Sequence, residues 1–267
     1  MYTAPFKYVR AKTLTEAEAL FRDSSDARYI AGGQTLIPTM KQRLAAPADL
    51  IDIARISSLS FIRRQGNAIV IGAATTHADV AASKVVREAI PALAALAGEI
   101  GDPAVRHKGT LGGSVANNDP AADYPAGVLG LGATLKTTAR TIAADEFFTG
   151  MFATLLEPGE IITEISFPLP RRAGYAKFRN PASRYAMAGV FVADFGPGVR
   201  VAVTGAAPCV FRFAQMETAL TEDFAPGTIA GIALAAEGLN ADLFGSAEYR
   251  AHLVGIMAKR AIEAAVL

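Results

Sequence analysis

Residues 109–123 read Gly-Thr-Leu-Gly-Gly-Ser-Val-Ala-Asn-Asn-Asp-Pro-Ala-Ala-Asp, the densest concentration of glycine and asparagine in the chain. A second Gly-Gly pair, Gly32-Gly33, follows a short apolar run and precedes Gln34-Thr35. Glycine lets the backbone take positive φ and has no Cβ, so such loops can bring several N–H groups close to an anion. One isolated pair would more often be a tight turn. Two pairs, Gly32-Gly33 and Gly112-Gly113, favour loops that hold a pyrophosphate from both sides.

The usual nucleotide-binding signatures are missing around these glycines. The sequence contains no GxxxxGK[ST] and no GxGxxG that opens a helix after a strand, which argues against a P-loop and against a Rossmann NAD site. Asp123 could cap a helix or bind ribose hydroxyls, and composition alone favours the cap. Ser114 has no histidine at a motif-like spacing, so the sequence gives little support to a hydrolase nucleophile.

Outward from these loops, strands and helices alternate without a strict βαβ repeat, which favours an α+β architecture. The apolar patterns predict strands at 6–10, 29–31, 50–53, 61–63, 68–71, 133–138, 161–167, 188–194 and 199–204. They predict helices that begin after Thr13 (in the capping-box pattern Thr13-x-x-Glu16) and near 78, and helices at 36–44, 86–100, 126–131, 227–239 and 246–266. We expect residues 109–123 to be irregular and 65–67 to form a three-residue hairpin loop. Prolines 168 and 170 mark a domain boundary, which divides the chain into 1–170 and 171–267.

Composition excludes several classes of protein. Lys plus Arg number 26 and Asp plus Glu 25, so the charge balance disfavours a nucleic-acid or anionic-membrane partner. With 51% hydrophobic and 19% charged residues, the chain is too apolar to be disordered. No apolar stretch approaches the roughly 18 residues of a membrane span. The N-terminus lacks the apolar core of a signal peptide, so we expect a cytoplasmic protein.

Cys209 is the only cysteine, which excludes an internal disulfide and an iron–sulfur cluster held by this chain, since such clusters usually need four thiolates. We expect Cys209 to be a buried small hydrophobe. His77, His107 and His252 are far apart and show no HExxH spacing, so a metal site on this chain is not expected. His77 and His107 adjoin glycine-rich segments and are expected to hydrogen-bond to backbone.

Residues 31–38 and 110–123 strongly resemble the two FAD-binding loops of the medium, flavoprotein subunit of molybdenum hydroxylases, the carbon monoxide dehydrogenase and xanthine dehydrogenase family. Segments 160–168, 177–186 and 248–250 are also similar to that family, so the resemblance covers nearly the whole chain. It implies a PCMH-type FAD-binding domain, as in vanillyl-alcohol oxidase, over 1–170, with lobes at roughly 1–55 and 56–170. A small C-terminal α+β domain, 171–267, would follow, with a three-stranded sheet and helices.

The resemblance also implies roles for single residues. Residues 30–37 would wrap the pyrophosphate and ribityl chain, 110–114 would supply a second set of N–H donors, and Asp123 would hydrogen-bond to FAD. Lys177 would favour the anionic reduced flavin, and Tyr185 would lie against the isoalloxazine ring; taken alone, 177–185 is equally compatible with a solvated strand edge. Ile100 and Ile162 match apolar walls. The implied cofactor-binding residues are Ile30, Ala31, Gly32, Gly33, Gln34, Thr35, Leu36, Ile37, Ile100, Thr110, Leu111, Gly112, Gly113, Ser114, Asn117, Asp123, Ile162, Lys177 and Tyr185, with no catalytic residue and no metal ligand.

Three departures from the family pattern have consequences. Gln34 stands where covalent flavoproteins of this superfamily often carry a histidine, so FAD is expected to be non-covalent and released on denaturation. His107-Lys108 replaces a more usual Asn-Arg pair. Arg184 stands where an acidic residue often precedes the aromatic one. The last two could alter the electron acceptor or a subunit contact.

The function implied is that of the FAD subunit of a heterotrimeric molybdenum hydroxylase. It would take electrons from [2Fe–2S] clusters on a small subunit and pass them to an external acceptor, while a large subunit carries molybdopterin; two heterotrimers would form the assembly. One alternative is a stand-alone flavin oxidoreductase, for which Tyr185 is the only obvious acid or base. Another is a non-catalytic scaffold without FAD, which would not need the two intact glycine pairs.

Overall fold

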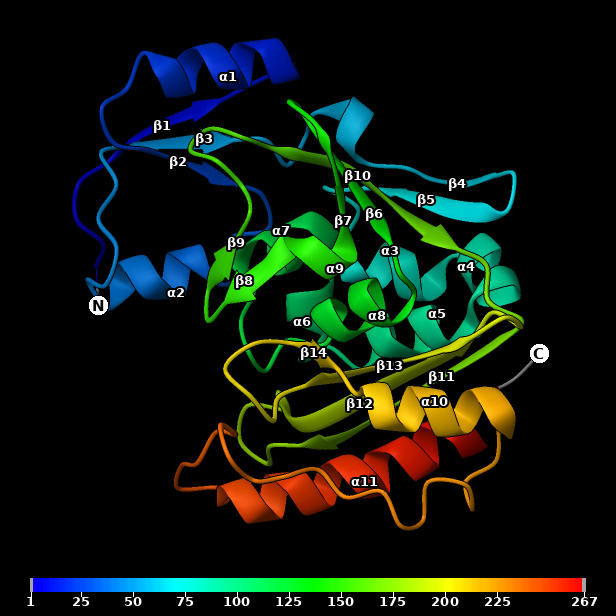
Figure 1. The fold of residues 1–267 in the computed structure, drawn as a ribbon. Coiled ribbons are helices and arrows are strands. Elements are labelled where there is room, and N and C mark those ends of the chain that lie inside the picture. The colour runs from blue at the N-terminus through cyan, green and yellow to red at the C-terminus, as the bar shows by residue number, and fades with distance from the viewer. Residues whose placement is uncertain (1, 266–267) are drawn as a thin grey trace.

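The computed structural model describes residues 2–265 of the 267-residue chain. The described residues form three larger sheets and a two-stranded hairpin. In Figure 1 the first two of the larger sheets lie in the upper half and the third lies below them, with a group of short helices between the second and the third. The mixed arrangement of parallel and antiparallel sheets with segregated helices confirms the predicted α+β class. None of the helices in the described part of the chain is long and apolar enough to cross a membrane.

The first sheet is parallel and has the order β1-β3-β2. Its strands are β1 (Lys7–Arg10), β2 (Ala27–Ile30) and β3 (Asp49–Asp52). Helix α1 (Leu14–Arg22) begins where predicted, because the Thr13 hydroxyl accepts the N–H of Glu16 at 3.1 Å. Helix α2 (Leu36–Lys41) ends before the predicted residue 44, and Arg43 takes a left-handed φ of 63° just beyond it.

The second sheet is antiparallel and has the order β4-β5-β10-β6-β7. Its strands are β4 (Ile62–Gln65), β5 (Ala68–Gly72), β6 (Thr134–Thr137), β7 (Thr141–Ala143) and β10 (Ile162–Pro168). In the predicted hairpin, Gln65 pairs with Ala68. The loop therefore has two residues, 66–67, rather than the predicted three, because Gly66 takes a positive φ of 57° that allows the tighter turn.

Short helices fill the space beside this sheet. They are η1 (Ser57–Leu59), α3 (His77–Ala82), α4 (Lys84–Ala89), α5 (Pro91–Gly98), α6 (Pro103–Arg106), α7 (Leu111–Asn117), α8 (Tyr124–Gly130) and α9 (Ala144–Phe147). The prediction of one helix over 86–100 was wrong. The chain breaks at Ile90, with φ −141° and ψ 73°, because the following Pro91 disfavours helical backbone before it and has no N–H.

The expectation that 109–123 is wholly irregular was also wrong, because α7 lies within it. The Thr110 hydroxyl caps this helix by accepting the N–H of Gly113 at 3.2 Å. The helix ends at Asn118, which takes left-handed φ and ψ of 43° and 51°. Beyond α9, the two short strands β8 (Phe148–Gly150) and β9 (Ala153–Thr154) form a hairpin.

The third sheet is antiparallel, with three long strands, β11 (Arg172–Arg179), β12 (Ala186–Asp194) and β13 (Val199–Thr204), and the two-residue β14 (Phe211–Arg212) at its edge. Helices α5 and α8 pack on one face, and α11 (Ala247–Glu263) covers the other (Figure 1). All nine residues of β12 are buried between these layers. The predicted hairpin of residues 188–194 and 199–204 is confirmed.

One helix prediction in this part was wrong, and one helix was not predicted. Residues 227–231 and 237–238 form turns and residues 232–236 are irregular, so the predicted helix at 227–239 is absent. Helix α10 (Ala214–Glu222) was not predicted. The predicted last helix is α11, and its expected end at Val266 lies outside the described residues.

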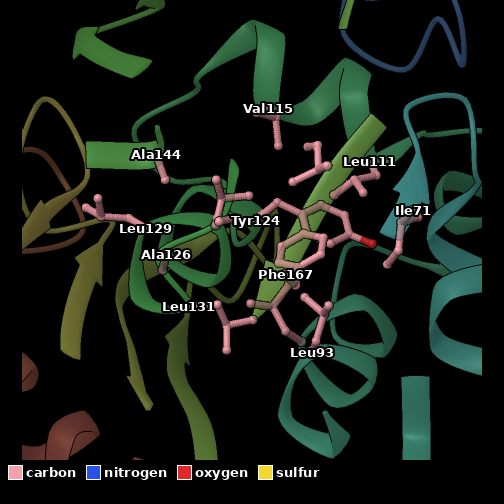
Figure 2. Packing of buried hydrophobic residues seen from close by; sticks show 14 of the residues in the cluster. Ile71, Leu93, Leu111, Val115, Tyr124, Ala126, Leu129, Leu131, Ala144 and Phe167 are labelled. Atoms are coloured by element: carbon pink, nitrogen blue, oxygen red, sulfur yellow. The ribbon is translucent and has the colours of Figure 1, made fainter. Parts of the chain in front are cut away.

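The largest apolar cluster crosses the predicted domain boundary. It joins Leu93 of α5, Tyr124 of α8 and Phe167 of β10 with Phe191 and Ala202 of the third sheet. Figure 2 shows part of this cluster around Tyr124 and Phe167. A second cluster lies between the third sheet and α11, and a third lies under α1. The division at residue 170 stays a prediction.

Candidate cofactor site

The two glycine loops touch each other backbone to backbone. A Cβ added to Gly32 would lie 2.1 Å from the carbonyl oxygen of Lys108 and 2.7 Å from the Cα of Gly109. No side chain fits in that space, so glycine is required there by close approach. The loop after β2 and the loop before α7, far apart in the sequence, thus meet.

The first loop has N–H groups with no protein partner. Gly33 takes a positive φ of 69°, and the chain turns so that the Ile37 N–H donates to the Gly33 carbonyl at 3.1 Å. In this turn, the backbone N–H groups of residues 32–35 donate to no acceptor among the described residues. These residues are half-buried or exposed. Successive free N–H groups around a turn are the donor set that binds a phosphate or pyrophosphate.

The second loop uses its N–H groups differently. Leu111 donates to the Thr75 carbonyl at 3.0 Å, and Gly112 donates to the Ala73 carbonyl at 2.8 Å. Gly113 donates to the Thr110 hydroxyl at 3.2 Å, and Ser114 donates to the Thr110 carbonyl at 3.0 Å. Four of the five residues predicted as N–H donors, 111–114, are therefore engaged inside the protein. This glycine pair holds the loop against residues 73–75.

Some groups of α7 remain partly accessible. Gly113 is exposed, and Ser114 and Asn117 are half-buried. Ser114 and Asn117 are three residues apart in one helix, so their side chains lie on the same face. The predicted contribution of this segment therefore rests on the Thr110 N–H and on these two side chains.

Two predicted site residues bind each other. The Asp123 side chain, at the start of α8, is 5% exposed and lies 2.8 Å through Oδ1 from the ammonium of Lys177, whose side chain is fully buried. Lys177 Nζ also donates to Asp123 Oδ2 at 3.0 Å and to the Glu99 carbonyl at 2.9 Å. The Tyr175 hydroxyl donates to the same carboxylate. Sequence reasoning missed Tyr175. The signal was its position two residues before Lys177, on the same face of a strand.

Burial fixes the protonation of several aromatic side chains here. Burial raises the pKa of Tyr175 well above 10, and the Asp123 carboxylate raises it further, so the phenol remains a donor. Burial also raises the pKa of Tyr185, with smaller contributions from Asp119 and Asp123. Burial lowers the pKa of His77 to about 4, so its ring is neutral at pH 7.

Tyr185 lies on the wall of a cleft of about 390 Å³. Its side chain is 43% exposed. Asp119, Asn180 and Arg250 also line the cleft, and Met151 contributes from the connection between β8 and β9. The buried Arg250 guanidinium is held by the carbonyls of Met187 and Gly205 at 2.8 and 3.0 Å and by Asp242 at 2.7 Å.

The predicted apolar walls differ in burial. Ile100 is half-buried and packs on the main apolar cluster, whereas Ile162 is 4% exposed and belongs to the interior of that cluster. Their contact with a cofactor stays a prediction. Cys209 is half-buried, 3.6 Å from the side-chain amide of Asn118.

The histidines also differ from one another. The His107 ring contacts the Pro103 carbonyl at 2.7 Å, as predicted. The His77 ring packs against Gly109. Its buried Nδ1 has no partner in the described structure, which does not support the expected hydrogen bond of His77 to backbone. No group of three or more His, Cys, Asp or Glu side chains suited to a metal ion occurs among residues 2–265.

Comparison with known proteins identifies the family of this chain. Residues 4–170 match the family described as the FAD binding domain in molybdopterin dehydrogenase. The chain is 36% identical to the carbon monoxide dehydrogenase medium chain of Hydrogenophaga pseudoflava, over 97% of this chain and 96% of that one. It is 34% identical to the nicotine 6-hydroxylase medium subunit of Paenarthrobacter nicotinovorans, over 96% and 95%. A chain of reconstituted carbon monoxide dehydrogenase from Oligotropha carboxidovorans superposes with a TM-score of 0.88 at 33% identity, over 99% and 98%.

Proposed function

Because the chain belongs to the family of FAD-binding domains in molybdopterin dehydrogenases, we propose that it is the electron-transfer subunit of a three-subunit molybdenum hydroxylase. Its FAD receives electrons from [2Fe–2S] clusters on a small subunit and passes them to an external acceptor. A large subunit carries molybdopterin and the substrate. Two such heterotrimers form the assembly, and the complex works in the cytoplasm.

The free N–H groups of residues 32–35 carry the proposal. A pyrophosphate needs several donors at once, and this loop presents them around the positive φ of Gly33. Bound FAD supplies the redox chemistry, because it exchanges electrons both singly and in pairs. Gln34 offers no histidine nitrogen for a covalent bond, which supports non-covalent binding.

The remaining residues of the site orient the cofactor. The contact of Gly32 with Lys108 and Gly109 fixes the first loop against the second. Ser114 and Asn117 offer polar side chains from α7, and Tyr185 offers an aromatic face in its cleft. Asp123 and Lys177 fix the start of α8 to β11.

The subunit assignment has two further supports. The lone Cys209 cannot hold an iron–sulfur cluster, so a redox chain that uses one must continue on another polypeptide. Three relatives that match over nearly their whole length are named medium chains or a medium subunit. The relatives are named for different substrates, carbon monoxide and nicotine among them, so the substrate is not assigned from this chain.

The test is FAD retention by the full chain. Purified protein is incubated with FAD, passed through gel filtration and examined by visible absorption. Acid precipitation then separates non-covalently bound flavin, which is released, from covalently attached flavin, which stays with the protein. We expect retained flavin that moves to the supernatant. Gly32→Ala should abolish retention, because its Cβ would collide with the Lys108 carbonyl. Gly198→Ala is the matched control, since nothing lies within 4 Å of the added Cβ.

A colourless wild-type chain that stays folded would contradict the FAD assignment and favour the scaffold alternative. Flavin reduced by a small organic substrate without partners would favour the stand-alone oxidoreductase. Co-purification from the native source tests the subunit part, which fails if neither a Cys-rich small chain nor a molybdopterin-containing large chain is found.

A further inference from the structure

One face of β11 joins the third sheet to the helices of the candidate site. Tyr175, Lys177 and Arg179 alternate along the strand, so their side chains point the same way. Tyr175 and Lys177 bind Asp123 of α8, and Arg179 lies 3.0 Å from the carboxylate of Glu99, just after α5.

The two ion pairs differ in burial, and burial decides how strongly solvent screens each of them. Arg179 and Glu99 are 51% and 37% exposed, so solvent screens their interaction. Lys177 and Asp123 are 0% and 5% exposed. A buried ammonium without a nearby carboxylate is costly, and the two oxygens of Asp123 lie 2.8 and 3.0 Å from it. The Tyr175 hydroxyl adds a third donor to the carboxylate.

We propose that Asp123, Lys177 and Tyr175 form a buried unit of zero net charge within the proposed cofactor site, in which Asp123 cancels the charge of Lys177. In this unit Tyr175 is a positioning residue that holds the carboxylate against the ammonium. The inference rests on the proposed function and modifies it. Lys177 was expected to favour reduced flavin by its positive charge, but the ion pair leaves no net charge with which to do so.

Reduction adds negative charge to the flavin, so a nearby unit charge shifts its midpoint potential. Asp123→Asn leaves a charge of +1 and should raise the potential. Lys177→Met leaves −1 and should lower it. The double variant is again neutral and should return to the wild-type value. Arg179→Gln is the matched control, because it removes a cation from the same face of the same strand at an exposed position.

The measurement uses the full chain loaded with FAD and equilibrated with a reference dye. Flavin occupancy is determined first, so failure to bind FAD is separated from failure of the inference. At the dye potential, we expect the ratio of reduced to oxidised flavin to change by about tenfold, the order expected for one unit charge in a partly dehydrated site. The ratio of reduced to oxidised flavin should increase in Asp123→Asn and decrease in Lys177→Met.

Two results would overturn the proposal. Asp123→Asn with the wild-type potential would mean that the carboxylate cancels nothing at the flavin, and a double variant that matches Lys177→Met would mean that Lys177 acts uncompensated.

Tyr175→Phe keeps the ring and removes the donor, so it should shift the potential in the direction of Asp123→Asn by a smaller factor. A folded, FAD-loaded Tyr175→Phe protein with the wild-type ratio would remove Tyr175 from the unit. Circular dichroism confirms folding, and the neutral double variant remains informative if a single variant does not fold.

Discussion

Lys177 Nζ lies 2.8 Å from Asp123 Oδ1. This buried contact joins β11 of the third sheet to Asp123, the residue that precedes α8. The two residues are 54 positions apart in the sequence. Their contact fixes the position of the end of the glycine-rich segment relative to the C-terminal sheet. The candidate site therefore depends on both parts of the chain.

Lys177→Met should destabilise the protein by about 3–5 kcal/mol, because it leaves a buried carboxylate without its cation. Combining it with Asp123→Asn should recover most of that loss, since no charge then remains buried. Urea unfolding followed by circular dichroism gives both free energies. Two single-variant losses that simply add in the double variant would show that the pair is not coupled.

Gly112→Ala should cost about 1–3 kcal/mol in unfolding free energy through overpacking. The added Cβ would lie 2.5 Å from the Ala73 Cβ and 2.8 Å from its carbonyl oxygen, neither of which can move freely. Gly255→Ala in α11 is the control, because the space around it is open. It should be stabilising by about 0.5–1 kcal/mol, as expected for glycine replaced by alanine in a helix. Equal effects of the two substitutions would contradict the packing argument.

Acid should weaken the fold through His77. Its pKa is about 4 in the folded protein and about 6.5 when unfolded, so the unfolded chain binds more protons between these values. The contribution is fully present above pH 6.5 and is lost as the pH falls toward 4, with a total of about 3 kcal/mol. Unfolding free energies of wild type and His77→Gln across that range measure it. The exposed His252→Gln is the control, and an unchanged pH slope in His77→Gln would rule the explanation out.

Asn118 should hold the β8–β9 hairpin. Its buried amide nitrogen donates to the carbonyls of Gly150 and Ala153, both at 2.8 Å. Asn118→Ala loses these bonds and also places alanine in left-handed backbone, whereas Asn118→Gly loses the bonds alone. We expect a loss of about 1–3 kcal/mol for Asn118→Gly, with a larger loss for Asn118→Ala.

Hydrogen exchange should report faster exchange at residues 150–154 in both Asn118 variants. Asn117→Ala, one residue away and half-buried, is the control. Protection of the hairpin that survives in Asn118→Gly would show that other contacts hold it.

Local chemistry made much of the fold predictable. The Thr13 cap and the β12–β13 hairpin around Gly196-Pro-Gly198 follow from short-range patterns. The edge strands β7, β11 and β14 were not predicted. The errors arose where long-range contacts or backbone geometry decided the outcome. Helix α7 forms in a glycine-rich segment because Thr110 caps it and residues 73–75 hold its first turn. Residues 227–239 have suitable apolar spacing but no helix.

The candidate site shows the same limit. The two glycine pairs were recognisable from the sequence, and the contact of Gly32 with Lys108 and Gly109, which precede the second pair, follows from the fold. Sequence could not tell that the N–H groups of Leu111 and Gly112 are already engaged, because their acceptors, the carbonyls of Thr75 and Ala73, lie on a separate segment. It also could not show that Asp123 and Lys177 bind each other through contacts that include Tyr175.

The apolar cluster that crosses residue 170 limits how the protein can be divided. Phe191 of β12 packs against the backbone of α8, where a Cβ on Gly130 would lie 2.9 Å from its ring. A truncation that kept only the first 170 residues would expose to water the apolar surface of α8 that Phe191 covers, together with Leu93 beside it. Such a fragment should aggregate, and the full chain should melt in a single cooperative transition.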